Sequence, residues 1–202
     1  EASQSIQLMQ GTEEEESGEE GHEGHNHSHE LDPHVWLDPV LAQKEVTAIR
    51  DALIKKYPEK KAVFEKNTVA YLEKLTALDK EYQAAFAGAK NRTFVTQHAA
   101  FGYLAKQYGL TQEPIAGISP DQEPSPSRLA ELKKYIKTNN VSVIYFEASA
   151  STKVAKTLAD ETGVELAVLN PLESLTQKEQ EAGENYVSVM KENLAALQKS
   201  IH

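Results

Sequence analysis

The sequence predicts an α/β fold built around a mostly parallel sheet. Downstream of residue 92, short apolar runs such as 141–146 and 164–169 alternate with helical patterns of roughly 10–15 residues. This alternation is typical of βαβ units, in which a helix connects two parallel strands. Upstream of residue 92 the periodic segments are helical only. We therefore expect the sheet to lie within residues 89–202.

The negative charge of the chain is concentrated at its N-terminal end. Of 202 residues, 31 are acidic and 21 are Lys or Arg, for a net charge of -10, and residues 1–43 hold 11 of the acids and none of the bases. An acidic excess argues against nucleic-acid binding and favours cations as partners. The sequence has no cysteine, which excludes disulfides, thiolate zinc sites and thiol catalysis.

The first thirty residues carry a His-rich segment. Residues 1–10 are compatible with a short helical or extended piece, and residues 11–30 contain no aliphatic side chain, so we expect a mobile loop there. Four of the seven histidines lie within eight residues of this loop: His22, His25, His27 and His29. A solvated tract is the alternative, but this density favours weak capture of metal ions at several sites.

Two helices are expected before the sheet. Asp38 and Pro39 form an N-cap and N1 pair for a helix over 39–57, which Pro58 stops. A second helix over 59–87 carries one apolar stripe, made of Phe64, Tyr71, Leu75, Leu78, Tyr82 and Ala85. Its length of about 43 Å would allow it to connect two lobes.

The remaining elements follow from buried runs and their caps. Strands are predicted over 93–97, 114–118, 141–146 and 164–169. Helices are predicted over 99–108, 126–138, 151–162 and 177–201, with Ser125 as a cap and Gly109 and Gly163 as stops.

Polar side chains follow three of these strands, where an α/β sheet binds its ligands. His98, Glu147 and Glu173 each come shortly after a strand, while His34 lies in a proline-flanked turn outside the sheet. Two imidazoles and a carboxylate form a set suited to Zn²⁺. Each residue also has a structural interpretation: a hydrogen-bonded core histidine, or for Glu147 a carboxylate near a helix start. For Trp36 we expect core packing against the turn.

Four segments in order resemble one family. They are DPHVWLDP (32–39), TQHAAFGYLAKQYGL (96–110), GISPDQEPSPSRL (117–129) and IYFEASASTKVAKTLADETG (144–163). Together they resemble the metal-specific solute-binding proteins of ABC importers, cluster A-I, in the zinc branch of ZnuA/AdcA type. The resemblance implies two α/β lobes joined by a long rigid helix, with one metal ion bound between the lobes.

The resemblance also implies how the chain is divided and which residues bind metal. Residues 1–58 would be the remnant of an N-terminal lobe with the His-rich loop at 11–30, residues 59–88 the connecting helix, and residues 89–202 the C-terminal lobe. His34, His98 and Glu173 would be zinc ligands, and Glu147 would hydrogen-bond a ligand. The family's first ligand, a histidine, would belong to an upstream part that this sequence lacks.

The implied function is capture of Zn²⁺ and its delivery to a membrane permease, without catalysis. Such a protein is exported, as a cell-surface lipoprotein or into the periplasm, and we expect it to be a monomer. Two alternatives remain at this point. One is a zinc-dependent hydrolase with Glu147 as general base, since three protein ligands plus water form a catalytic arrangement. The other is a surface metal-binding adhesin.

Overall fold

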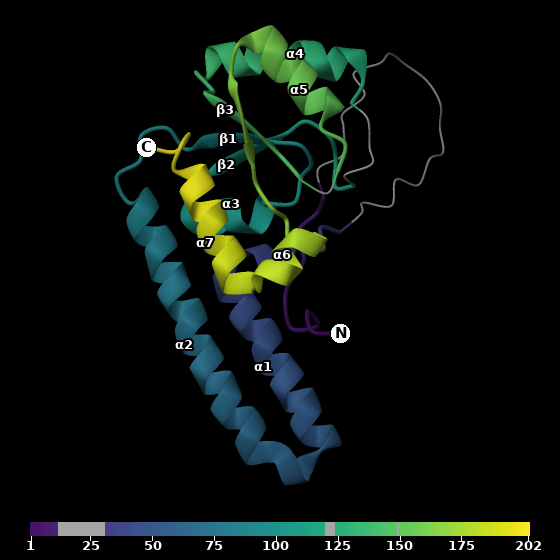
Figure 1. The fold of residues 1–202 in the computed structure, drawn as a ribbon, viewed down its shortest axis with the longest axis vertical. Helices are drawn as coiled ribbons and strands as arrows, with labels where there is room; N and C mark the ends of the chain where they lie inside the picture. Colours follow the sequence, from purple (N-terminus) through teal and green to yellow (C-terminus); the bar gives the residue numbers. More distant parts are fainter. Residues whose placement is uncertain (12–30, 120–123, 149) are drawn as a thin grey trace.

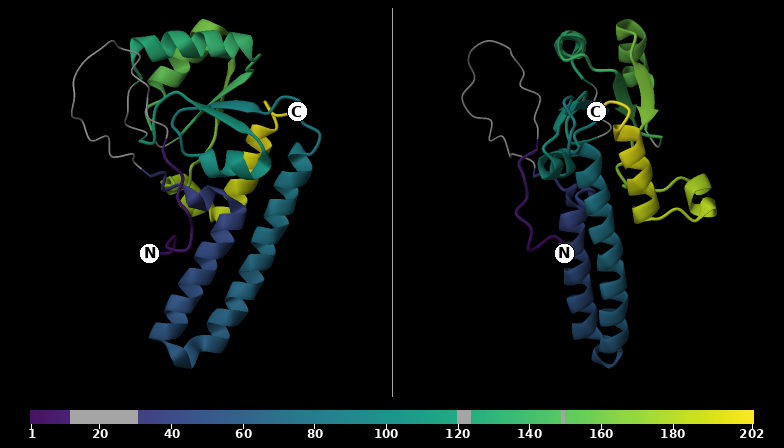
Figure 2. Two further views of the ribbon diagram at one scale, coloured as in Figure 1. Left: turned by 180° about the vertical axis from the view of Figure 1, so that it is seen from behind. Right: turned by 90° about the vertical axis from the view of Figure 1, so that its left-hand side faces the viewer.

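A small α/β lobe lies at one end of a long helical hairpin. The computed structural model describes residues 1–11, 31–119, 124–148 and 150–202. The hairpin consists of α1 (Pro39–Lys56) and α2 (Lys61–Phe86), joined by the 3-10 turn η2 (Pro58–Lys60). The two helices lie side by side in all views, and only one end of the hairpin meets the lobe (Figures 1 and 2).

The lobe contains the parallel sheet that the sequence predicts. Its strands are β1 (Thr93–Thr96), β2 (Thr111–Pro114), β3 (Val143–Phe146) and β4 (Glu165–Val168), in the order β2-β1-β3-β4. All three neighbouring pairs are parallel. The α/β fold class is confirmed.

Two helical layers cover the sheet. Adjacent strand residues point to opposite faces, so Phe94 and Tyr145 belong to one core cluster, and Val95 and Ile144 belong to the other. On the first face lie α3 (Gly102–Tyr108), α7 (Tyr186–Leu197) and the end of α2; on the second lie α4 (Pro126–Thr138) and α5 (Lys153–Thr162) (Figure 1). The sheet is thereby buried on both sides.

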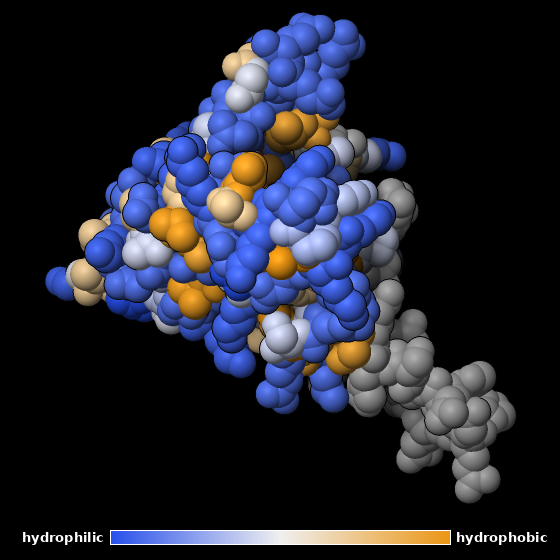
Figure 3. All heavy atoms as spheres, turned by 90° about the horizontal axis from the view of Figure 1, so that it is seen from below, coloured by the Kyte–Doolittle hydropathy of each residue, from blue (hydrophilic) through white to orange (hydrophobic). Residues whose placement is uncertain are grey.

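Of the two hairpin helices, α2 reaches the sheet, and the apolar side chains that it buries lie in its C-terminal half. Leu75, Leu78, Tyr82 and Phe86 of α2 are almost fully buried, whereas its first half buries Thr68 alone. Viewed along the hairpin, apolar side chains lie scattered between hydrophilic ones on the described surface (Figure 3). None of the helices within the described ranges has the length and apolarity needed to cross a bilayer.

Two predictions of elements were wrong. The second strand lies at Thr111–Pro114 and not at 114–118, because it is a polar edge strand that the apolar pattern does not reveal. The predicted helix over 177–201 is two helices, α6 (Gln177–Ala182) and α7. Gly183, at φ 78°, ends α6, and the Asn185 side chain caps α7.

The first residues of the chain lie against the lobe. After a turn, the segment continues to Gln10, which pairs with Leu31 in an isolated antiparallel bridge. Ile6 packs with Val35 and Tyr103 in a small third cluster. The predicted loop with His22, His25, His27 and His29 lies outside the described residues.

Candidate metal centre

His34 is held by the turn that begins the hairpin. It is the N-cap of a 3-10 turn, η1 (Val35–Leu37), and is 3% exposed. Oδ1 of Asp32 accepts hydrogen bonds from the His34 backbone N–H at 2.9 Å and from Nδ1 at 2.7 Å. Both bonds fix the ring, so that Nε2 is the nitrogen left for other partners.

His98 is held at the carboxyl end of the sheet. It follows β1, and Glu147 follows the neighbouring strand β3; they are 1% and 3% exposed. Because β1 and β3 are parallel, their carboxyl ends meet, and Nδ1 of His98 donates a hydrogen bond to Oε1 of Glu147. The Oγ1 of Thr96 and the Nε2 of Gln112 donate to the His98 carbonyl at 2.7 and 3.0 Å.

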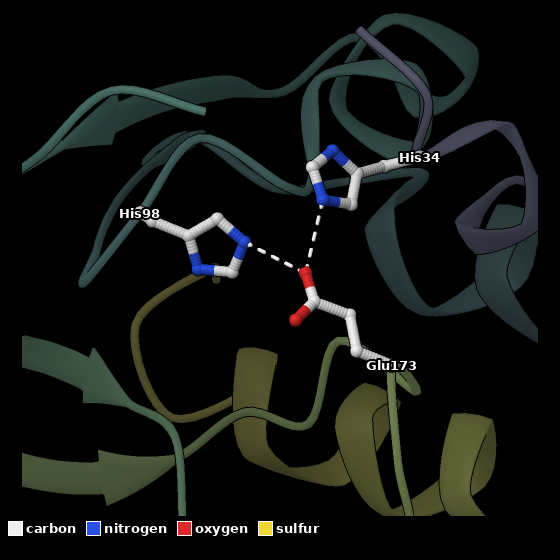
Figure 4. Close-up of side chains that lie close together, drawn as sticks. All are labelled: His34, His98 and Glu173. Atoms are coloured by element: carbon white, nitrogen blue, oxygen red, sulfur yellow. Dashed lines mark hydrogen bonds and ion pairs between the residues drawn. The ribbon is translucent and has the colours of Figure 1, made fainter. Parts of the chain in front are cut away.

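Glu173 brings a carboxylate to both imidazoles. It lies in the turn after β4, and its Oε1 is 3.1 Å from Nε2 of His34 and 3.2 Å from Nε2 of His98 (Figure 4). Its side chain is 35% exposed, which gives the group access to solvent. One ligand atom from each of the three residues lies within 4.8 Å of the others, and the described residues contain no further group of this kind.

The donor set and its spacing fit a zinc ion. Ligands about 2.0–2.2 Å from a tetrahedral metal are roughly 3.3–3.5 Å apart, close to the two Nε2–Oε1 distances. With each Nδ1–H donated to a carboxylate, the neutral rings present the Nε2 lone pair. The Nε2 of His98 is buried and has no hydrogen-bond partner, as expected of an atom intended for a metal.

Protons compete with a metal at His34. Burial lowers the pKa of this imidazole, but the hydrogen bond and charge of Asp32, followed by those of Glu173, outweigh burial and raise it above its ordinary value. The same carboxylates that attract a divalent cation therefore also attract a proton. Metal binding must displace that proton.

The structure brings together the residues that the sequence singled out and adds one that it missed. His34, His98 and Glu173 converge, and Glu147 lies behind His98, on the Nδ1 side of the ring. Sequence reasoning missed Asp32, although its spacing of two residues from His34 suits a carboxylate that accepts the His34 backbone N–H. Trp36 packs against the core cluster as expected.

Comparison with known proteins supports one family. The family model described as the periplasmic zinc-uptake complex component A, ZnuA, matches residues 1–200. The high-affinity zinc uptake system protein ZnuA of Bacillus subtilis strain 168 is 57% identical over 200 residues, which are 99% of this chain and 62% of that protein. The zinc-binding lipoprotein AdcA of Streptococcus pneumoniae serotype 4 is 56% identical over 199 residues, 98% of this chain and 40% of AdcA. The chain thus spans between about two fifths and three fifths of these relatives.

Solved structures agree. The Zn(II)-bound ZnuA-like domain of Streptococcus pneumoniae AdcA is 58% identical with a TM-score of 0.74, over 84% of this chain and 64% of that one. The laminin-binding protein Lmb of Streptococcus agalactiae is 34% identical with a TM-score of 0.85, over 99% of this chain and 70% of that one. Given a family match along nearly its whole length and relatives more than half identical to it, this chain belongs to the ZnuA family of solute-binding proteins for zinc uptake.

Proposed function

We propose that this chain captures Zn²⁺ through His34, His98 and Glu173, as the solute-binding component of an ABC importer that delivers the ion to a membrane permease. The observation that carries the proposal is the convergence of three ligand atoms within 4.8 Å. They come from three separate segments, and His34 and Glu173 are 139 residues apart in sequence. Membership in the ZnuA family and the Zn(II)-bound relative support zinc as the cargo.

The chemistry of capture follows from the hydrogen bonds around the two rings. Asp32 and Glu147 accept hydrogen bonds from the two Nδ1–H groups. These bonds orient both rings and increase the basicity of Nε2. Glu173 adds a negative charge that offsets part of the charge of the ion. Two imidazoles favour zinc over Mg²⁺ and Ca²⁺, which prefer oxygen ligands. The ion is bound and released as Zn²⁺, without any chemical reaction.

The division of the chain and its location are part of the same proposal. We infer that α2 is the helix that connects two lobes, that residues 1–58 belong to the N-terminal lobe, and that residues 89–202 form the C-terminal lobe. The burial of apolar side chains in the C-terminal half of α2 alone is compatible with this role. The description of AdcA as a lipoprotein supports an exported protein at the cell surface or in the periplasm. We propose that the protein acts as a monomer.

The position of Glu147 disfavours hydrolysis by the same site. A general base must reach a water molecule on the metal, yet Glu147 accepts from Nδ1 of His98, while Nε2 on the other side of the ring faces Glu173.

Adhesion is a second candidate function. The structurally similar Lmb is described as bifunctional, with adhesin and metal transporting activity. Surface plasmon resonance on immobilised laminin would test it with both metal-free and zinc-loaded protein. Saturable binding would support adhesion, and a response no larger than that on an albumin-coated surface would reject it.

Titration calorimetry with zinc tests the proposed site. We expect His34→Ala, His98→Ala and Glu173→Gln each to weaken binding by at least about a hundredfold, because each removes one ligand. His202→Ala is the matched control, since it removes an exposed imidazole at the other end of the lobe. Tight binding that survives all three substitutions would place the zinc site elsewhere.

A further inference from the structure

The single tryptophan of the chain contacts the two segments that carry His34 and Glu173. Trp36 follows His34 by two residues, and the two rings are 5.2 Å apart between centroids. Its indole Nε1–H donates a hydrogen bond of 2.9 Å to the carbonyl of Pro171, two residues before Glu173. The bond therefore joins the segment that carries His34 to the turn that carries Glu173.

The turn at 170–173 depends on such hydrogen bonds because it is not part of a helix or strand. Asn170 donates its backbone N–H to Oδ1 of Asn193 at 2.8 Å, and Nδ2 of Asn193 donates back to the Asn170 carbonyl at 2.7 Å. Oδ1 of Asn170 accepts from the backbone N–H of Leu172, which has a φ of 56°. A left-handed conformation is strained for leucine, so surrounding contacts must hold it.

Trp36 is itself fixed from the other side. The Tyr186 hydroxyl, at the start of α7, donates a hydrogen bond of 2.6 Å to the Trp36 carbonyl. This bond joins η1 to α7 but does not involve the turn that carries Glu173. The structure thus provides two short hydrogen bonds on one residue, only one of which connects two ligand-bearing segments.

We propose that Trp36 is a positioning residue for zinc capture, whose indole N–H···O=C bond to Pro171 holds His34 and Glu173 at metal-binding distance before the ion arrives. The inference rests on the proposed function. A site that is already assembled loses less conformational entropy when it binds its ion. Coupling between two equilibria is reciprocal, so the bond strengthens zinc binding by the same factor as zinc strengthens the bond.

Zinc dissociation rates test the role of the indole bond. Trp36→Phe keeps an aromatic ring and removes the N–H, and we expect zinc to leave this variant about fivefold faster, the effect of one neutral hydrogen bond. Tyr186→Phe is the matched control, because it removes the other short bond to Trp36; its dissociation rate should stay within about twofold of the wild type. Stopped-flow mixing of zinc-loaded protein with a chelator gives the rates. An unchanged rate in Trp36→Phe, or equal acceleration in both variants, would overturn the proposal.

The wild-type chain provides a second test that needs no substitution. One tryptophan gives one indole N–H resonance in a ¹H–¹⁵N NMR spectrum. By reciprocity, saturating zinc should slow the exchange of this proton with water about fivefold, and exchange unaffected by zinc would contradict the coupling.

The experiments distinguish failure of the proposed function from failure of the positioning role. A wild-type chain that does not bind zinc refutes the proposed function and the positioning role together, whereas normal wild-type binding with these negative results refutes the positioning role alone.

Discussion

At the scale of single residues, two carboxylates determine what the histidines can do. Asp32 accepts from Nδ1 of His34, and Glu147 accepts from Nδ1 of His98. All four side chains are almost fully buried, so these hydrogen bonds are shielded from solvent. Each imidazole is therefore held in orientation before a metal binds, and its neutral form is the tautomer with the proton on Nδ1.

Neutralising either carboxylate should weaken zinc binding without removing a ligand. We expect about ten- to hundredfold lower zinc affinity in Asp32→Asn and in Glu147→Gln. The neutral amide lacks the negative charge that makes the Nε2 of each imidazole a stronger metal ligand. Titration calorimetry measures the loss, with Asp51→Asn as the control for an exposed carboxylate. Wild-type affinity in both variants would show that ring orientation does not depend on these charges.

The raised pKa of His34 predicts how zinc affinity depends on pH. Because Asp32 and Glu173 together outweigh burial, the protonated ring persists at a higher pH than for a free histidine. As the solution is acidified, zinc affinity should therefore begin to decrease while the pH is still above about 6.5, the ordinary pKa of histidine. Calorimetry in buffers of different ionisation enthalpy should detect protons released at that pH. Zinc binding with no proton release there would contradict this expectation.

At the scale of secondary-structure elements, the caps begin and end the helices. The Asp38 side chain accepts from the Val40 backbone N–H at 2.7 Å, with Pro39 in the first helical position, as the sequence predicts. Burial raises the pKa of this carboxyl from its ordinary 3.8 to about 6. The cap that begins α1 is thus a buried acid whose charged form is destabilised.

The pH dependence of stability should differ between Asp38 and its amide. A carboxyl with a raised pKa in the folded state destabilises the fold increasingly as the pH rises from 3.8 to about 6, and fully above that. Asp38→Asn keeps a capping oxygen without the charge, so it should be the more stable protein at pH 7.5, with little difference near pH 4. Asp38→Ala should lose about 1 kcal/mol of unfolding free energy relative to Asp38→Asn at both pH values. Urea unfolding gives these energies, and a wild type more stable than Asp38→Asn at pH 7.5 would contradict the prediction.

Most elements could be predicted from the sequence because they are apolar, capped or both. The strands β1, β3 and β4, whose sequences are largely apolar, were predicted within a few residues, whereas β2 is polar. The break between α6 and α7 is encoded by Gly183 and Asn185, a helix stop followed by a helix cap. The local pattern is therefore informative where a strand is apolar, even at the edge of the sheet as in β4, and less so where a strand is polar.

The same distinction applies to the candidate site. Positions after strands predict His98, Glu147 and Glu173 from topology alone, since parallel strands end at one edge. His34 lies outside the sheet, so the strand topology does not place it. It was grouped with His98 and a Glu because of the donor types alone, and the family resemblance then implied that it is a ligand. The bond from Trp36 to Pro171 spans 135 residues of sequence and depends on how a turn packs, which no local pattern contains.

At the scale of the whole molecule, the site draws its residues from both parts of the structure. His34 lies at the base of the hairpin, and His98 and Glu173 lie in the lobe. The end of α2 joins the core cluster that contains Phe94, Tyr145 and Met190. Hairpin and lobe therefore share one hydrophobic core directly beside the candidate metal centre.

Deletion of residues 12–30 should separate capture from tight binding. The deletion leaves Gly11 and Leu31 at its edges, and Gln10 is already paired with Leu31, so a short linker can rejoin the chain without moving Asp32 or His34. We expect zinc to load more slowly after the loss of His22, His25, His27 and His29, while the equilibrium affinity of the His34 site is unchanged. Stopped-flow loading and calorimetry measure the two quantities. Abolished tight binding would show that the histidine-rich segment forms the principal site.

The hairpin also behaves as a lever. Its anchored end lies in the core and its far end, at η2, is free of the lobe (Figure 2). A helix of 26 residues is about 39 Å long, so a rotation of roughly five degrees at the anchor displaces the tip by about 3 Å. A rotation of the hairpin that barely changes the distances between the ligands would thus displace the tip by several ångströms, which makes the tip the place for spin labels that test whether the hairpin rotates.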